Sequence, residues 1–379
     1  MKIIIAPDSF KESLSSHEVA AAIEAGFKEV FPDADCIKLP MADGGEGTVE
    51  ALVAATAGHT VDVEVCGPLG EKVKAFYGVC GDQQTAVIEM AAASGLALVP
   101  PEKRNPLLTT SYGTGELIRA ALDAGYRQFV VGIGGSATND AGVGMLQALG
   151  VRFLGQDGGE IGPGGAALEQ LERIDMGALD QRLRDVDIEV ACDVNNPLTG
   201  RSGAAAVFGP QKGATPDMVE ALDRCLGRFA EIVRRDLGIN IEGQPGAGAA
   251  GGMGAALMGF LSAKLRSGVK IVIAHVGLEE QVRDADLVIT GEGRIDGQSV
   301  FGKAPVGIAE VAQRFGVPVV ALAGSLGPGA EAVKARGITA LFSVVPGPCS
   351  LEQALMNAGD NIRQTAAHVA AVIKMSRKD

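Results

Sequence analysis

The sequence predicts an α/β protein of two domains, in which both ends of the chain build one doubly wound parallel sheet. The chain has 379 residues, which is long for a single domain. Strand and helix patterns alternate over residues 1–62 and again over 268–379, as they do in parallel sheets. Residues 63–267 follow a different pattern, so we expect them to form an inserted mixed α/β domain.

The first elements follow the β-α-β-α order of a parallel sheet. The apolar run at residues 2–7 predicts a short buried strand. A helix is expected next, because Ser15 and Glu18 have capping-box spacing. Its apolar face is formed by Val19, Ile23, Phe27 and Val30. A second strand at 34–40 and a second helix at 45–58 complete this part.

The middle of the chain changes to a pattern typical of antiparallel strands. Apolar and polar residues alternate over 61–80 and 85–91, with Gly-Pro punctuation. We then expect a helix at 116–125, a strand ending at Gly132, a strand at 187–194 and helices between 215 and 265. The small residues of 246–261 indicate close helix packing under a loop rather than a cofactor site.

The last third of the chain returns to the first pattern. It predicts four successive strand–helix units, whose strands are expected at 270–276, 286–293, 318–327 and 340–347. A long helix follows at the C-terminus. Together with the first two strands, these units form the doubly wound domain.

Composition excludes several classes of protein. The formal net charge is −13 and Lys and Arg form no block, which argues against nucleic-acid and anionic-membrane partners. No apolar segment reaches the roughly 18 residues of a membrane-spanning helix. The six cysteines are scattered without a Cys-x-x-Cys pair, so we expect reduced thiols in a cytoplasmic protein. The four histidines lack metal-ligand spacing and no G-x-S-x-G motif occurs, which disfavours zinc hydrolysis and triad chemistry.

Polar residues gather where the predicted strands end. Ligands of open parallel sheets bind outside the carboxyl ends of the strands. In the terminal domain these ends are 6–11, 41–47, 290–297, 323–327 and 344–348, and the inserted domain adds 132–140 and 191–200. One polar strand end is usually a solvated loop, but several together indicate a ligand-binding cleft between the domains.

The segment VVGIGGSATNDAG, at 130–142, predicts a phosphate site. Glycines allow the backbone to approach an anion, and a helix starting near Asn139 would direct free amide groups at it. The expected phosphate-binding residues are Gly134, Gly135, Ser136 and Thr138. A capped turn without a ligand is the alternative. A second alternative is a dinucleotide-binding motif, since GIGGSA fits G-x-G-x-x-A and Asp157 lies downstream. This alternative is weaker, because antiparallel strands precede the segment.

Lys303 is a second candidate phosphate ligand. Residues 297–304 match G-x-x-x-x-G-K, but Ala304 replaces the hydroxyl that a P-loop needs, so a P-loop fold is rejected. Pro305 suits the first turn of a helix, which places Lys303 at the positive end of that helix. A plain surface lysine is the alternative.

Five acids lie at predicted strand ends, among three cations. The acids are Asp43, Glu46, Asp193, Glu292 and Asp296, and the cations are Lys11, Arg294 and Lys303. Each acid alone could equally cap a helix or bind a loop. As a set they are typical of a Mg²⁺-dependent kinase site, in which carboxylates hold the metal and one of them accepts a proton.

Five stretches of the chain, in this order, resemble the type 1 glycerate kinase family. They are APDSFKESLSS, PMADGGEGT, GIGGSATNDAGVG, CDVNNPLTGRSGAAAVFGPQKGA and DLVITGEGRIDGQSVFGKAP. The resemblance spans nearly the whole chain. It implies a flavodoxin/Rossmann-like domain and ATP-dependent phosphorylation of D-glycerate, in glyoxylate, glycolate or sugar-acid breakdown. One departure is Glu12, where the family more often has glycine.

Physical chemistry then suggests a role for each candidate residue. We expect Lys11 or Arg294 to hold the glycerate carboxylate, for which arginine offers a bidentate grip. Asp193 is the expected general base, so the predicted catalytic residues are Asp193, Lys11 and Arg294. The predicted substrate-binding residues are Asp8, Ser9, Asn195 and Asp296, and the predicted Mg²⁺ ligands are Asp43 and Glu46.

The reaction product and two alternative functions can also be stated. The product 2-phosphoglycerate is favoured over 3-phosphoglycerate. Two alternatives stay open: a non-catalytic protein that binds or senses a small acid in the same cleft, and an NAD-linked hydroxyacid dehydrogenase. A pure anion receptor would gain nothing from four or five carboxylates around its ligand, which argues against the first.

Overall fold

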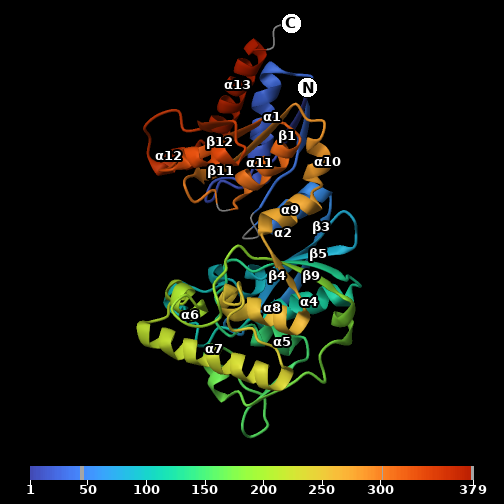
Figure 1. Ribbon diagram of the computed structural model, residues 1–379, viewed down its shortest axis with the longest axis vertical. Helices are drawn as coiled ribbons and strands as arrows, with labels where there is room; N and C mark the ends of the chain where they lie inside the picture. The colour runs from blue at the N-terminus through green and yellow to red at the C-terminus, as the bar shows by residue number, and fades with distance from the viewer. Residues whose placement is uncertain (43–46, 301, 377–379) are drawn as a thin grey trace. The chain divides into compact units, whose positions relative to one another are not determined.

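The computed structural model describes residues 1–42, 47–300 and 302–376. The chain divides into two compact units, coloured by position along the chain in Figure 1. We call them the terminal unit (Met1–Asp43, Glu50–Ala57 and Val269–Asp379) and the inserted unit (Gly44–Val49 and Gly58–Gly268). Both ends of the chain therefore build one unit, and the middle builds the other.

The terminal unit contains a five-stranded, fully parallel sheet in the order β13-β12-β11-β1-β2. Its strands are β1 (Lys2–Ile5), β2 (Asp35–Lys38), β11 (Leu287–Ile295), β12 (Val319–Leu326) and β13 (Ala340–Ser343). Counted along the chain within the unit, this order is 2-1-3-4-5, which is that of flavodoxin-like folds. The strand order reverses between β1 and β11, where such folds bind ligands.

Helices cover the sheet of the terminal unit. They are α1 (Ser16–Val30), α2 (Thr48–Thr56), α9 (Gly268–His275), α10 (Leu278–Val282), α11 (Ala304–Arg314), α12 (Leu351–Met356) and α13 (Ala358–Ser376), with a 3₁₀ helix at Ala330–Arg336. The predicted capping box of α1 is present, because Ser15 and Glu18 exchange hydrogen bonds. Helices α1 and α13 pack side by side, and Gly26 makes this possible: a Cβ there would lie 2.0 Å from the Arg363 carbonyl oxygen.

One predicted strand is wrong. Residues 270–276 lie mostly in helix α9 rather than in the sheet. The buried residues Val269, Val272 and Val276 are three and four positions apart, which is helical spacing. A short apolar run alone does not separate a buried strand from a buried helix, because either one can be covered on all sides.

The inserted unit contains a six-stranded mixed sheet in the order β10-β9-β6-β5-β4-β3. Its strands are β3 (His59–Cys66), β4 (Lys72–Val79), β5 (Thr85–Glu89), β6 (Gln128–Gly132), β9 (Asp187–Ala191) and β10 (Lys264–Arg266), and β7 (Arg152–Leu154) pairs with β8 (Arg173–Asp175) separately. The expected antiparallel pairing holds for β3–β4 and β4–β5. On its other side, β5 is parallel to β6, so the prediction for β5 is half right.

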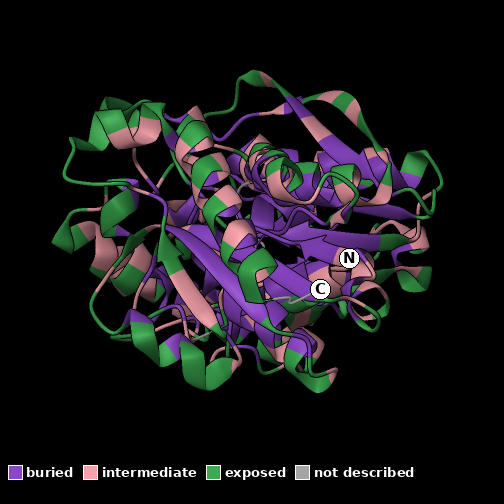
Figure 2. Cartoon of the chain, turned by 90° about the horizontal axis from the view of Figure 1, so that it is seen from above, coloured by how far each residue is buried: buried purple, intermediate pink, exposed green. Residues whose placement is uncertain are grey.

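The helices of the inserted unit are α3 (Ala91–Ser94), α4 (Tyr112–Asp123), α5 (Val143–Ala148), α6 (Ala204–Phe208), α7 (Pro216–Leu237) and α8 (Met253–Leu261). Short 3₁₀ helices lie at Leu96–Leu98, Pro101–Lys103, Gly165–Gln170, Gln181–Asp185, Pro210–Lys212 and Ala249–Gly252. Strand β5 is buried along its whole length, whereas many exposed residues lie on helices and loops (Figure 2). In the core, the rings of Phe153, Phe229 and Phe260 lie 6.0–6.3 Å apart.

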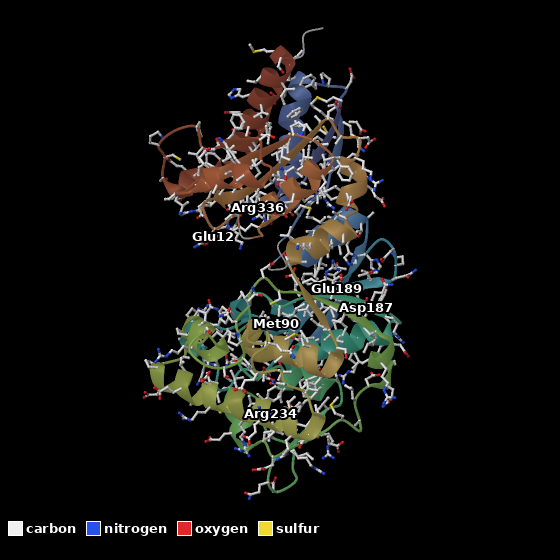
Figure 3. All side chains as sticks on the ribbon, viewed as in Figure 1. Glu12, Met90, Asp187, Glu189, Arg234 and Arg336 are labelled. Carbon is white, nitrogen blue, oxygen red and sulfur yellow. The ribbon has the colours of Figure 1, made fainter. Side chains whose placement is uncertain are left out.

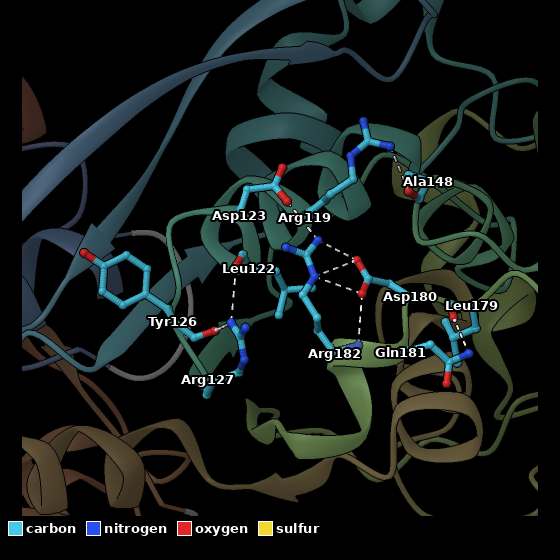
Figure 4. Close-up of polar contacts among 10 residues, drawn as sticks. All are labelled: Arg119, Leu122, Asp123, Tyr126, Arg127, Ala148, Leu179, Asp180, Gln181 and Arg182. Carbon is cyan, nitrogen blue, oxygen red and sulfur yellow. Dashed lines mark hydrogen bonds and ion pairs between the residues drawn. The ribbon is translucent and has the colours of Figure 1, made fainter.

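Ion pairs join neighbouring segments on the surface of the inserted unit. On neighbouring strands β9 and β10, Asp187 pairs with Lys264 at 2.8 Å and Glu189 pairs with Arg266. Figure 3 labels the two acids, Asp187 and Glu189. Figure 4 shows a further pair of contacts at Arg182, which binds Asp180 at 2.6 Å and Asp123, the last residue of α4, at 2.8 Å. Among the described residues, no helix has the length and apolar character that crossing a membrane requires.

Candidate active site

The carboxyl end of β1 runs beside the carboxyl end of β11, at the point where the strand order of the terminal unit reverses. The Asp8 amide donates to the Gly291 carbonyl oxygen at 2.8 Å. Further along, a Cβ on Gly293 would lie 3.5 Å from Phe10 Cα and 3.6 Å from the Lys11 amide nitrogen. Glycine at 293 thus lets the two segments pass closely, and this brings the predicted residues of 8–11 next to those of 292–296.

Asp8 and Ser9 lie just after the carboxyl end of β1. Asp8 is buried, and its Oδ1 accepts a hydrogen bond from the Ser9 amide at 2.7 Å. Lys11, two residues on, is exposed. The exposed lysine, beside a buried carboxylate, can bind an anionic group of a ligand.

Arg294, near the end of β11, and Asp296, the residue that follows β11, are hydrogen-bonded to each other. Asp296 accepts from the Gln298 amide at 2.9 Å and from Arg294 Nε at 3.1 Å. The Gln298 amide, followed by the Arg294 guanidinium, lowers the pKa of Asp296 from its ordinary value. Asp296 is therefore ionised at neutral pH and orients Arg294, whose side chain stays 63% exposed.

Lys303 stands at the N-terminus of α11, as the sequence predicts. It is the N-cap residue, and Pro305 lies in the first turn. Its Nζ binds Glu292 Oε2 at 3.0 Å, while Ser299 Oγ donates to Glu292 Oε1 at 2.7 Å. Glu292 is buried, so these contacts fix the lysine head close to the end of β11.

A pocket of about 940 Å³ opens within the terminal unit beside these residues. Lys11, Arg294 and Lys303 line it, and so do apolar residues that follow β13 and belong to α12. Its size is at the upper end of the roughly 300–1,000 Å³ that small-molecule sites occupy.

The Lys11 turn also holds a strained residue. Glu12, labelled in Figure 3, has φ of 64°, a left-handed conformation that glycine adopts without cost. Replacing Glu12 with glycine is expected to stabilise the protein by about 1 kcal/mol, because the side chain is exposed and the relief of left-handed strain exceeds the entropy that glycine adds to the unfolded chain. Urea unfolding measures the change.

Glu29→Gly is the matched control, because Glu29 lies in helix α1. There the same replacement is expected to destabilise the protein by about 1 kcal/mol or more, because glycine is a poor helix former and the ion pair of Glu29 with Arg363 is also lost. A loss of stability in Glu12→Gly would contradict the strain argument.

In the inserted unit, the predicted phosphate loop follows β6. Gly134 and Gly135 are exposed, whereas Ser136 and Thr138 are buried. Lys212, itself only 1% exposed, donates from Nζ to Ser136 Oγ at 2.7 Å and to the Thr138 carbonyl oxygen at 2.6 Å. The buried lysine holds the inner side of the loop while its two glycines face outward.

Asp140 anchors the far end of the same loop. It is 1% exposed and its carboxylate accepts from the Ser111 amide and hydroxyl and from the amides of Gly142 and Gly144. Burial raises the pKa of Asp140, and these four donors oppose that shift. Burial also lowers the pKa of Lys212 to about 7, which the Asp140 charge opposes.

The helix expected near Asn139 begins later, at Val143. The intervening residues are enclosed instead: Thr138 and Asn139 are fully buried, and the Thr138 hydroxyl and both polar atoms of the Asn139 amide have no hydrogen-bond partner among the described residues. Gly251, with φ of 66°, packs on this loop, since a Cβ there would lie 2.0 Å from the Thr138 carbonyl oxygen. The small residues of 246–261 therefore serve close packing, although 249–252 bend rather than continue a long helix.

Asp193 and Asn195 follow strand β9 and are both exposed. Asp193 Oδ1 accepts from the Gly268 amide at 3.3 Å. Because β6 and β9 are parallel neighbours with Gly132 opposite Ala191, their carboxyl ends share one edge of the sheet. This edge brings Asp193 and Asn195 together with the loop of Gly134 to Ser136.

Each unit thus collects one group of the predicted residues. The terminal unit has Asp8, Ser9, Lys11, Arg294, Asp296 and Lys303, and the inserted unit has Gly134, Gly135, Ser136, Thr138, Asp193 and Asn195. The predicted Mg²⁺ ligands Asp43 and Glu46 lie outside the described residues. Within 1–42, 47–300 and 302–376, no three His, Cys, Asp or Glu side chains converge as a metal site.

Lys212 is the residue that sequence reasoning missed. It lies in one of the motifs that carry the family resemblance, but nothing local marks it as a contact of Ser136. One feature of the sequence could have drawn attention to Lys212: it is the single charged residue in the stretch 203–214, which consists mostly of small and apolar residues. A lysine in such a run is either exposed at a turn or buried with partners, and here it is buried.

Comparison with known proteins decides the family. A model described as the glycerate kinase family matches residues 3–374. The chain belongs to the glycerate kinase family. It is 59% identical over 377 residues to a glycerate kinase of Bacillus subtilis (strain 168), covering 100% of this chain and 99% of the relative. It is 55% identical over 379 residues to a glycerate 2-kinase of Escherichia coli (strain K12), covering 100% of both.

A solved structure agrees with this assignment. The crystal structure of a protein described as glycerate kinase 2 from Salmonella typhimurium LT2 matches with a TM-score of 0.91 and 59% identity, over 100% of this chain and 99% of that one. The predicted family, the α/β fold class and the phosphotransferase class are confirmed. A glycerate kinase is an enzyme, so neither a non-catalytic receptor nor an NAD-linked dehydrogenase describes this chain.

Proposed function

We propose that the protein transfers the γ-phosphoryl group of ATP to D-glycerate and releases 2-phosphoglycerate. One observation carries the proposal: three cations, Lys11, Arg294 and Lys303, line one pocket at the ligand-binding edge of a flavodoxin-like sheet. The whole chain has a net charge of −13, so an anionic nucleotide or acid needs local donors. Lys11 and the partly exposed heads of Arg294 and Lys303 provide them, although Asp296 and Glu292 pair with the last two.

Phosphoryl transfer requires neutralisation of charge and alignment of the reacting oxygens more than covalent chemistry. The proposed division of labour follows from residue type. Lys303 and the loop of Gly134 to Ser136 bind phosphate oxygens, and Arg294 or Lys11 binds the glycerate carboxylate. Asp193 accepts the proton of the attacking hydroxyl.

Mg²⁺ is proposed as the metal that accompanies ATP. A nucleotide-bound Mg²⁺ needs only one or two protein carboxylates, because phosphate oxygens and water supply its other ligands. A site with fewer than three protein ligands is compatible with the described residues. Asp43 and Glu46 remain the proposed ligands on their residue type and position in the sequence.

The predicted location of the reaction, in a cleft between the two domains, stays a prediction. Many kinases close around their substrates to exclude water. Small-angle scattering with ATP and D-glycerate tests this, because closure reduces the radius of gyration and an unchanged radius contradicts it.

The activity is tested by measuring ADP release from ATP with D-glycerate as the acceptor. We expect ADP to form only when D-glycerate is present, with L-glycerate as the matched control for stereochemistry. Calorimetric titration with D-glycerate separates binding from turnover. Binding of D-glycerate without ADP release would contradict the proposal.

The phosphate role of the loop is tested at Ser136. In Ser136→Ala, the loop loses the hydroxyl that contacts Lys212, and we expect a roughly tenfold increase in the KM for ATP, a fall in kcat, or both. Ser202→Ala, an exposed serine in the same unit, is the control and should leave both constants within about twofold. If Ser136→Ala behaves like the control, the phosphate role fails at this residue.

A further inference from the structure

The pocket of the terminal unit has two kinds of wall. Lys11, Arg294 and Lys303 come from the ends of β1 and β11 and from the start of α11. Apolar side chains come from the segment after β13 and from α12; they are Val344, Val345, Pro348, Leu351 and Leu355. Strand β13 lies two positions from β11 in the sheet, so the two walls are about 10 Å apart at the usual strand spacing.

The volume of the pocket exceeds what an acid of the size of glycerate fills. Glycerate has about seven non-hydrogen atoms, and at the roughly 30 Å³ of liquid that a water molecule occupies they fill about 200 Å³. A nucleoside triphosphate has about thirty such atoms, so on the same basis, which is an upper bound for covalently bonded atoms, it fills no more than about 900 Å³. The pocket measures about 940 Å³, so it has room for a nucleotide.

The chemistry of the two walls matches the same molecule. The apolar wall includes Leu351, 71% exposed, and the pocket is also lined by Leu326, 40% exposed. Exposed leucines at the mouth of a pocket are typical of a site that covers them with a flat apolar ligand. Ser325 and Ser343 are exposed in the same lining and can hydrogen-bond sugar hydroxyls. Glycerate has no apolar part that would use these leucines.

We infer that this pocket binds the base and ribose of ATP against the β13–α12 wall, with the triphosphate directed toward the cationic wall, where Lys303 binds phosphate and Lys11 or Arg294 is left for the glycerate carboxylate. This inference rests on the proposed use of ATP and adds where the nucleoside binds. It assigns a ligand-binding role to α12, which no sequence motif indicated, and the nucleoside to the strand end at 344–348, which the sequence marked only as one of several polar ends.

Cys349 provides a direct probe in the unaltered protein. It lines the pocket, and among the cysteines of the described residues it is the exposed one. Its alkylation by N-ethylmaleimide is followed by peptide mass spectrometry. We expect ATP to slow this reaction at least tenfold, D-glycerate alone to leave it within twofold, and tripolyphosphate, which lacks a base, to protect much less than ATP.

Cys66 is the internal control, because it lies in the inserted unit and its reaction should not respond to ATP. Equal protection by tripolyphosphate and ATP would overturn the placement of the base. Protection by D-glycerate alone, or none by ATP, would overturn the whole inference.

A variant tests the same pocket through kinetics. Ala354→Trp places an indole within the lining, and the chain has no other tryptophan, so its fluorescence also reports binding. We expect the KM for ATP to rise at least tenfold while the KM for D-glycerate stays within about twofold. Ala332→Trp, at an exposed position in the same unit, should leave both constants unchanged.

The outcomes separate this inference from the proposed function. If the wild-type protein phosphorylates D-glycerate but Cys349 is unprotected and Ala354→Trp has the wild-type KM for ATP, the nucleoside binds elsewhere and the activity stands. If no phosphorylation occurs but ATP still protects Cys349, the pocket binds nucleotide and the proposed reaction is wrong.

Discussion

Replacing Asp140 with alanine is expected to destabilise the inserted unit by about 3–5 kcal/mol. The carboxylate accepts hydrogen bonds from three backbone amides, of Ser111, Gly142 and Gly144, and from the Ser111 hydroxyl, in a site closed to water. Each buried donor left without an acceptor costs about 1–3 kcal/mol. Lys212 also loses the neighbouring negative charge that favours its protonated form. Urea unfolding followed by circular dichroism measures the loss.

Asp157→Ala is the matched control. Asp157 is exposed and accepts a hydrogen bond from the Gly159 amide at 3.0 Å. Its loss should cost less than about 1 kcal/mol, because water replaces the carboxylate. A cost for Asp140→Ala as small as that of the control would contradict the role of Asp140 as the anchor of the loop.

The second large effect is a dependence of stability on pH that comes from Lys212. Its pKa is lowered from 10.5 to about 7 by burial, whereas the unfolded chain keeps the ordinary value. Between these two pKa values the unfolded state binds one more proton, so the free energy of unfolding should rise with pH. Over the full window the rise is on the order of 5 kcal/mol. Below about pH 7 both states are protonated, and this contribution is constant.

Lys212→Met isolates the effect, because methionine does not titrate and fills a similar volume. The free energy of unfolding of the wild type minus that of Lys212→Met should increase from pH 7 to pH 10. Lys264→Met, at an exposed lysine on β10, should show the same pH dependence as the wild type. A difference between wild type and Lys212→Met that stays flat with pH would contradict a neutral buried lysine.

Much of the terminal unit could be predicted because its signals are local. The Ser15–Glu18 capping box and the buried run of β1 are properties of neighbouring residues, and both are present in the structure. Residues 270–276 were predicted as a strand but lie mostly in a helix, because a short run of apolar residues shows neither helical nor strand periodicity clearly. The choice is decided by what packs around Val272, which is tertiary information.

The candidate site divides in the same way. The sequence identified Lys303 as a helix-terminal cation because Pro305 marks the start of α11. It did not identify Lys212, whose contact with Ser136 spans 76 residues and depends on how the chain folds back. The pocket wall formed by α12 was missed for a different reason: its leucines form an ordinary apolar pattern, and only their exposure beside Lys11 and Arg294 makes them distinctive.

We propose that this member of the glycerate kinase family phosphorylates the 2-hydroxyl of D-glycerate with ATP. A ³¹P NMR spectrum of the reaction with ATP and D-glycerate tests this proposal, because the spectrum identifies both ADP and the new phosphoester. We predict the resonance of 2-phosphoglycerate, growing as the γ-phosphate signal of ATP declines. A spectrum with 3-phosphoglycerate as the product, or with ADP and no phosphoester, would contradict the claim.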